Sequence, residues 1–122
     1  VSHAPTFLQK AGEVAIAKGE DDVLARAELF QERVDYCHRM LSSVKGISVP
    51  KPDGSFYLFP RIEGVSDSFN FALQLLRQTK VSVGPGVAFG NGGEGAMRIC
   101  AASDLSVLEP AMERFCKFVE RG

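Results

Sequence analysis

The length of the chain, 122 residues, suits a single hydrophobic core and argues against a complete two-domain enzyme. Hydrophobic residues make up 45% of the sequence and charged residues 24%, which is typical of an ordinary globular domain and not of a disordered or fibrous chain. The net charge of −1, without a run of Lys or Arg, argues against binding to nucleic acid or to an anionic membrane. No apolar stretch approaches the roughly 20 residues of a membrane span and no leader opens the chain, so we expect a cytoplasmic protein.

Two helices are predicted at the start of the chain. Residues 5–18 carry apolar side chains at helical spacing, and Gly19 is the expected stop. Residues 21–45 carry a longer stripe of apolar residues three or four positions apart: Val23, Ala27, Phe30, Val34, Cys37, Leu41 and Val44. On its solvated face, Asp22 with Arg26 and Asp35 with Arg39 are expected to pair. We expect this helix to pack on its own domain, with a coiled-coil partner as the alternative.

The middle of the chain predicts a strand, a helix and a second strand. Residues 55–59 are aromatic and apolar, follow a turn-forming segment, and are stopped by Pro60. Ser66 or Asp67 is then expected to cap a helix with one apolar face, formed by Phe69, Ala72, Leu73 and Leu76. Residues 81–83 are expected to form the next short strand.

The end of the chain predicts a buried strand at residues 96–101, after a glycine-rich loop at residues 84–95, and then a final helix. Ser106 and Glu109 have the spacing of a capping box, and Pro110 falls in the expected first turn. The inner face of this helix is expected to comprise Leu108, Ala111, Met112, Phe115, Phe118 and Val119. Taken together, the elements predict an α+β fold with a small mixed or antiparallel sheet, helices packed on one face, and a long helix before it.

The cysteines and histidines do not predict a reactive or metal site. Cys37, Cys100 and Cys116 are far apart, and each occupies an apolar position of a predicted element, so we expect small buried hydrophobes and neither disulfides nor zinc. His3 and His38 lie on different elements without companion ligands or nucleophiles, so surface or packing roles are expected.

Arg98 is the most informative candidate for a binding role. It lies in a strand whose other members are small or apolar, and a guanidinium in such a place needs an anion, because a buried unpaired charge costs several kcal/mol. The planar fork of an arginine suits a carboxylate in two-point contact. The anion is either a ligand or an internal carboxylate, for which Glu63, Glu94 and Asp104 are the candidates.

Two other features leave alternatives open. The loop of residues 84–90 matches neither nucleotide-binding glycine motif, so its glycines are expected to permit a sharp turn or a close approach of the backbone to a ligand or a neighbouring domain. The aromatic residues Phe56, Tyr57 and Phe59 are expected in the core, although such residues can also stack on a ring-shaped cofactor.

In chain order, these features resemble the small domain of fold-type I aminotransferases, the aspartate aminotransferase superfamily of class I/II. The resemblance extends from about Gly19 to the end and is carried by Pro52, Gly54, Phe56 and Tyr57, then Val81, Val83, Pro85, Gly86, Phe89 and Gly90, then Gly95, Arg98 and Ile99. Residues 1–18, and 2–11 above all, resemble the segment where such enzymes leave the large domain. The chain begins at Val1, without an initiator methionine, and this also favours a fragment.

The resemblance implies a division of roles. Residues 1–18 would be the tail of the large domain or an interdomain helix, and residues 19–122 the carboxy-terminal small domain. Arg98 matches the arginine that binds the α-carboxylate of an amino-acid or 2-oxo-acid substrate. Phe56 matches an aromatic residue bordering that site, Gly86 and Phe89 match the loop ahead of the arginine's strand, and all of these are expected to be substrate-binding. The lysine that carries pyridoxal 5'-phosphate belongs to the large domain, so no catalytic, cofactor-binding or metal residue is expected here, and the fragment alone should be inactive. The partners implied are the large domain, the substrate and a second subunit.

Two alternatives use the same residues differently. A free-standing module would hold a carboxylate ligand through Arg98 without catalysis, and a purely structural domain would pair Arg98 internally. Other fold-type I enzymes share this domain, so the resemblance does not fix the reaction or the amino acid.

Overall fold

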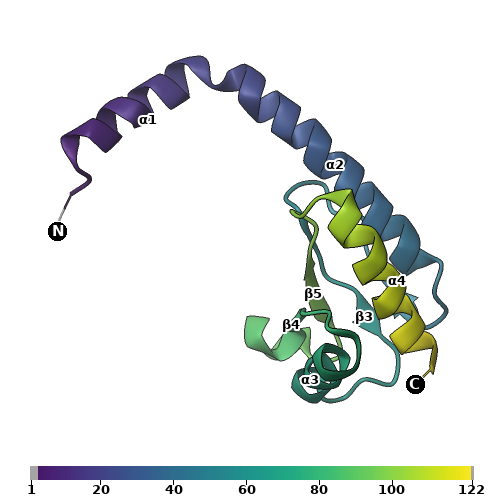
Figure 1. Cartoon of the computed structure of the whole chain (residues 1–122). Helices are drawn as coiled ribbons and strands as arrows, with labels where there is room; N and C mark the ends of the chain where they lie inside the picture. The colour runs from purple at the N-terminus through teal and green to yellow at the C-terminus, as the bar shows by residue number, and fades with distance from the viewer. Residues whose placement is uncertain (1–2, 122) are drawn as a thin grey trace.

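The computed structural model describes residues 3–121 and confirms the α+β fold (Figure 1). Its helices are α1 (Thr6–Lys18), α2 (Glu20–Ser42), α3 (Ser68–Thr79) and α4 (Leu105–Arg121), with the short 3₁₀ turns η1 (Gly86–Phe89) and η2 (Asn91–Gly93). Its strands are β1 (Ile47–Ser48), β2 (Tyr57–Leu58), β3 (Arg61–Ile62), β4 (Gly84–Pro85) and β5 (Met97–Cys100). No helix in this part of the chain combines the length and the apolar character needed to cross a bilayer.

The sheet is antiparallel and has β5 at its centre, between β2 and β4. In this register Tyr57 lies opposite Cys100, and Gly84 lies opposite Arg98. Strands β1 and β3 form a separate antiparallel pair. The strand predicted at residues 81–83 is wrong, because Lys80 ends α3 in the left-handed conformation, with a φ of 62°, and pairing begins only at Gly84. The strand predicted at residues 55–59 is shortened to Tyr57–Leu58, and Ser55 before it has a φ of 68°.

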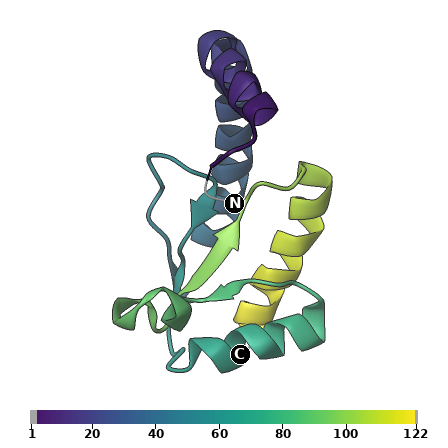
Figure 2. The same cartoon turned by 90° about the vertical axis from the view of Figure 1, so that its left-hand side faces the viewer.

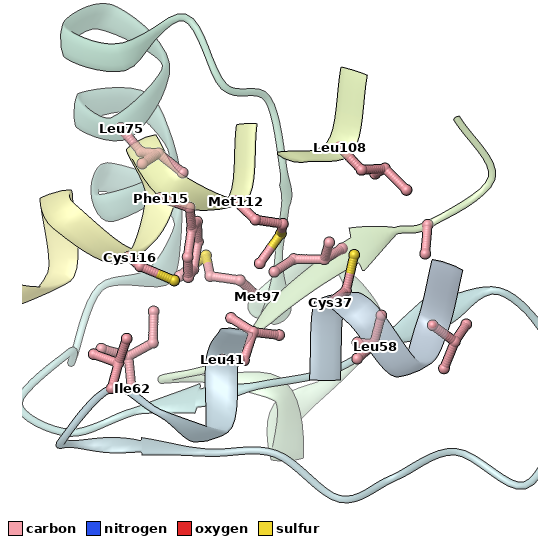
Figure 3. Close-up of a cluster of buried hydrophobic side chains, with 14 of the residues drawn as sticks. Cys37, Leu41, Leu58, Ile62, Leu75, Met97, Leu108, Met112, Phe115 and Cys116 are labelled. Carbon is pink, nitrogen blue, oxygen red and sulfur yellow. The ribbon is translucent and has the colours of Figure 1, made fainter. Parts of the chain in front are cut away.

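The core lies between the sheet, α4, α3 and the second half of α2 (Figure 3). Successive residues of a strand face opposite sides, so Met97 and Ile99 of β5 point into this core while Arg98 is half-buried and Cys100 exposed. Phe115 of α4 and Leu41 of α2 are fully buried. Burial of one such side chain contributes about 1.5–3 kcal/mol, so these contacts fix β5 firmly against the helices.

The first half of α2 and all of α1 extend away from this core as an arm (Figures 1 and 2). The apolar stripe predicted for α2 is buried from Val34 onwards, but Val23 near its start is 60% exposed, because α4 and the sheet reach only the second half. The predicted pairing of Asp35 with Arg39 is wrong, since Asp35 binds Lys51 at 2.7 Å and Arg39 stacks on Tyr36. Within residues 3–121, Asp22 and Arg26 form no ion pair either.

The caps and faces of α3 and α4 differ in part from the prediction. Asp67 caps α3 as expected, with its carboxylate accepting the Asn70 amide at 2.8 Å. The buried face of α3 is formed by Ser68, Ala72 and Leu75, whereas Phe69 and Leu76 of the predicted face are exposed. Helix α4 begins directly after Asp104, so Ser106 and Glu109 form no capping box and Pro110 lies beyond the first turn. The predicted inner face of α4 packs in the core except for Ala111, which is half-buried, and Cys116 is also buried on this helix.

The cysteines divide into two environments. Cys37 and Cys116 are buried as predicted, and burial raises the pKa of each thiol to about 11. Cys100 is exposed instead, because it shares the outer face of β5 with Arg98.

Thiol labelling should therefore distinguish one cysteine from the other two. At pH 8 a thiol with a pKa near 11 is ionised to roughly one part in a thousand, and only the thiolate reacts. We expect an aromatic disulfide reagent to modify Cys100 rapidly and Cys37 and Cys116 only after denaturant is added. Rapid modification of all three cysteines in the native chain would contradict this packing, and a Cys100→Ser variant identifies the fast site.

Candidate functional site

Arg98 lies on the outer face of the central strand, where its neighbours leave room for a large side chain. The residue opposite it on β4 is Gly84, which has no side chain. A β-carbon at Gly84 would lie 3.1 Å from the Phe89 ring and 3.5 Å from the Arg98 β-carbon. Gly84 therefore permits the Phe89 ring to approach the strand beside Arg98.

Two aromatic rings contact the guanidinium of Arg98. Its central carbon lies 4.3 Å from the centre of the Phe89 ring and 4.6 Å from that of Tyr57. Each contact of this kind contributes about 0.5–1 kcal/mol at an exposed site. Since the rings attract the cation without accepting its N–H groups in the guanidinium plane, those donors remain available to an anion.

The aromatic contacts continue outward on both sides. Phe59 meets the Phe89 ring edge-on at 5.9 Å, and Phe56 lies 4.7 Å from the Tyr57 ring and 5.1 Å from Phe30 of α2. Phe56, predicted to border the site, therefore supports Tyr57 and makes no ring contact with Arg98. Tyr57, which faces Arg98 directly, was not among the predicted site residues.

None of the three internal carboxylates considered for Arg98 pairs with it, and two of them have other partners. Asp104 forms an ion pair with Arg33, and Glu94 accepts the backbone amides of Ser68 and Gly95 at 2.6 and 3.0 Å. Glu63 is exposed beside Gly46. Within residues 3–121, no carboxylate lies within 4.0 Å of Arg98. The internal ion pair is thus not formed by the described part of the chain.

Gly86 shapes the loop that carries Phe89. Gly86 is buried, and its amide donates to the Ala96 carbonyl at 2.9 Å. A β-carbon here would overlap the carbonyl oxygen of Gly93 and lie 2.5 Å from that of Ala96. The loop folds closely against its own backbone at Gly86, and the predicted place of Gly86 beside the substrate stays a prediction.

Arg33 is a second arginine at this end of the sheet, and the sequence prediction missed it. Its guanidinium is buried, donates to the Ala102 carbonyl at 2.6 Å, pairs with Asp104, and lies 5.9 Å from the Phe30 ring. Its Nε has no hydrogen-bond partner among the described residues. Arg33 thereby connects α2 to the turn between β5 and α4.

Glu94 is held by hydrogen bonds from α3. The backbone amide of Ser68, that of Gly95 and the Ser68 hydroxyl all favour the carboxylate, and they lower the pKa of Glu94 below its ordinary value. The Ser68 oxygen in turn accepts the Val87 amide at 3.1 Å. Helix α3 is therefore joined to the loop of residues 86–95 through a buried side chain.

The expectation that no lysine here carries pyridoxal phosphate stays a prediction, but the setting of the lysines bears on it. A lysine that holds this cofactor needs an enclosed setting that favours its neutral amine, but Lys10, Lys18, Lys45, Lys51, Lys80 and Lys117 are all exposed. An open groove of about 1170 Å³, lined by residues of α3, α4 and the segment after α2, does not include Arg98. We assign it no role, because the aromatic contacts and available donors are at Arg98. Residues 3–121 contain no cluster of three potential metal ligands.

The chain is similar to aminotransferases both in sequence and in structure. A Bacillus subtilis protein named "Probable N-acetyl-LL-diaminopimelate aminotransferase" is 38% identical over 98% of this chain, which spans 30% of that protein. The crystal structure of an aspartate aminotransferase from Rhizobium meliloti superposes with a TM-score of 0.86 at 28% identity, over 99% of this chain and 33% of that one. A Methanococcus jannaschii protein, described as similar to kynurenine aminotransferases in its active site, gives a TM-score of 0.86 at 30% identity, over 95% and 31%. No protein-family model matches. The chain thus spans about a third of the length of its relatives.

Proposed function

Since this chain is a homologue of the class I aminotransferases of fold type I, we propose that it forms the carboxy-terminal small domain of a pyridoxal-phosphate-dependent aminotransferase. In this proposal residues 19–122 are the small domain and residues 1–18 the end of the large domain. Every described residue of α1 but one is exposed. This supports a domain boundary after residue 18, because a helix that leads to another domain buries little surface against this one. Val1 and Ser2 of this segment lie outside the described residues.

The observation that carries the proposal is Arg98 itself. It is a half-buried guanidinium stacked on Tyr57 and Phe89, and no described carboxylate pairs with it. Such a group suits a planar anion, since the two ring contacts hold it near the strand and the fork offers parallel N–H groups. We assign it the α-carboxylate of the amino-acid or 2-oxo-acid substrate.

The role of this chain in catalysis is then orientation and closure. A small domain that moves inward would bring Arg98 onto the substrate carboxylate, exclude water and fix the α-carbon. Pyridoxal phosphate supplies the electron sink for amino-group transfer when it is bound, and its site would lie in the large domain. In the full-length enzyme we expect a homodimer. The relatives carry different substrate names, so the proposal covers the substrate class and not one amino acid.

Activity should therefore require the longer protein. We expect the full-length enzyme, supplied with pyridoxal phosphate, to transfer amino groups from an amino acid to a 2-oxo acid, and the isolated chain to show no turnover above free pyridoxal phosphate. Absorbance titration of the isolated chain with pyridoxal phosphate should show no saturable change. A stoichiometric change that depends on one of its lysines would contradict the assignment of the cofactor to the large domain, and a full-length protein that binds carboxylates without turnover would favour a binding module.

A further inference from the structure

We propose that Ser68 and Glu94 are positioning residues for Arg98, because they hold the loop of residues 86–95 so that Phe89 stays on the guanidinium. The inference rests on the proposed function insofar as Arg98 binds the substrate carboxylate. Its structural part, the support of Phe89 by α3, stands on contacts among the described residues alone.

Phe89 is not held in place by its own burial. Its side chain is 46% exposed, and its ring contacts are with Phe59 and Arg98. Figures 1 and 2 show the 3₁₀ turns of this loop on the side of the sheet away from α4. The position of the Phe89 ring therefore depends on how the backbone of η1 is fixed.

Ser68 fixes that backbone from the first turn of α3. Its side chain is fully buried, and its oxygen accepts the Val87 amide at 3.1 Å, two residues before Phe89. The Ser68 amide donates to Glu94 Oε1 at 2.6 Å, and the Ser68 hydroxyl helps to lower the pKa of this carboxyl. One buried residue therefore joins the η1 backbone, the start of α3 and the end of the loop.

Glu94 completes the connection on the β5 side. Its carboxylate accepts the Gly95 amide at 3.0 Å. This hydrogen bond fixes the chain at Gly95, three residues before Arg98. The start of a helix favours a negative charge, which stabilises the ionised carboxylate there and keeps it from serving as the anion for Arg98. Ser68 and Glu94 thus hold Phe89 and the approach to Arg98 together.

Arg61 holds a different part of the same loop. It donates to the Gly92 carbonyl at 2.8 Å and to the Glu94 carbonyl, both on the η2 side. Loss of the Ser68 hydroxyl should therefore loosen η1 and Phe89 while Arg61 keeps the remainder of the loop in place. This separation makes a local effect on Arg98 measurable without unfolding of the domain.

The test compares Ser68→Ala and Glu94→Gln with Thr79→Val. Thr79 is the matched control, since its hydroxyl donates to the Leu75 carbonyl at 2.7 Å and accepts the Val81 amide at 3.2 Å, at the opposite end of the same helix. In the isolated chain, NMR of the Arg98 Nε–H group reports the ring currents of Phe89 and Tyr57. We expect its proton resonance to move in Ser68→Ala and Glu94→Gln and to stay in place in Thr79→Val, with thermal melts recorded for all three.

The kinetic test uses the full-length enzyme, with 2-oxoglutarate and the amino acid on which the wild type is most active as its substrates. We expect Ser68→Ala to raise KM about fivefold, the equivalent of about one lost hydrogen bond, because carboxylate binding contributes equally to substrate and transition state. Turnover should change less than about twofold, and Thr79→Val should alter neither constant by more than that. If Ser68→Ala folds poorly, Glu94→Gln, which keeps the size of the side chain, replaces it in this kinetic test.

The outcomes separate the two proposals. If neither the Arg98 resonance nor KM differs between these variants and Thr79→Val, Ser68 and Glu94 only cap α3 and the inference is wrong. If the resonance moves but KM does not change even in Arg98→Lys, the support of Phe89 holds and the carboxylate role of Arg98 fails. If Arg98→Lys raises KM and Ser68→Ala does not, the function stands and the positioning role is lost.

Discussion

Replacing Arg98 with lysine in the full-length enzyme should lower kcat/KM for amino-acid substrates by about a hundredfold, within the range measured when one partner of a buried charge pair is truncated. A lysine keeps the positive charge but has no planar fork, so it cannot bind a carboxylate at two points or reproduce the contacts of the guanidinium with Tyr57 and Phe89. Replacement with alanine should cost more, since the substrate carboxylate would then meet no cation.

The matched control is Arg39→Lys. Arg39 also stacks on an aromatic ring, 5.8 Å from the centre of Tyr36, but it lies on the exposed side of α2. We expect its substitution to leave kcat/KM within about twofold of the wild type. Steady-state kinetics with several amino acids should show the Arg98 penalty for all of them, because every one carries an α-carboxylate. An Arg98→Lys enzyme with unchanged kinetics would leave Arg98 a structural role only.

The unusual position of Arg98 could be predicted from the sequence, because it follows from one residue and its immediate neighbours, whereas its binding of an anion stays a prediction. A charged side chain in an apolar strand is informative wherever the strand lies. The aromatic contact with Tyr57 could not be predicted in the same way, because it depends on the pairing of β2 with β5 across the sheet. Strand β2 has two paired residues, too few for an alternating pattern to show which face Tyr57 takes.

The buried face of a helix could be predicted from the sequence where other elements cover the helix along its whole length, as in α4. The stripe of α2 is equally regular in both halves, yet only residues from Arg33 onwards are buried, because periodicity shows which side is apolar and not what covers it. In α3 the buried face differs from the predicted one. Ser68, which forms hydrogen bonds, is buried there, while Phe69 is exposed. Hydrogen bonds between residues 26 or 71 positions apart, such as Ser68 with Glu94 and Arg33 with Asp104, produce no local pattern at all.

Replacing Gly86 with alanine should destabilise the isolated chain by about 3 kcal/mol or more, one of the larger effects that a single methyl group produces. The new β-carbon would overlap the Gly93 carbonyl and approach that of Ala96, and both are backbone atoms that cannot rotate away. Relief of the overlap would pull the loop apart at the Gly86 to Ala96 hydrogen bond and so displace Phe89 from Arg98.

Gly92→Ala is the control for this effect, because a β-carbon at Gly92, in the same loop, would meet nothing within 4 Å. We expect it to change stability by about 0.5 kcal/mol or less. Urea unfolding followed by circular dichroism measures both variants, and equal slopes would show that the native state alone is affected. In the full-length enzyme, Gly86→Ala should also raise KM, since the loop that carries Phe89 is the part displaced. Equal unfolding midpoints for the two alanine variants would mean that the loop does not fold closely against its own backbone at Gly86, and the contact between Phe89 and Arg98 would then need another support.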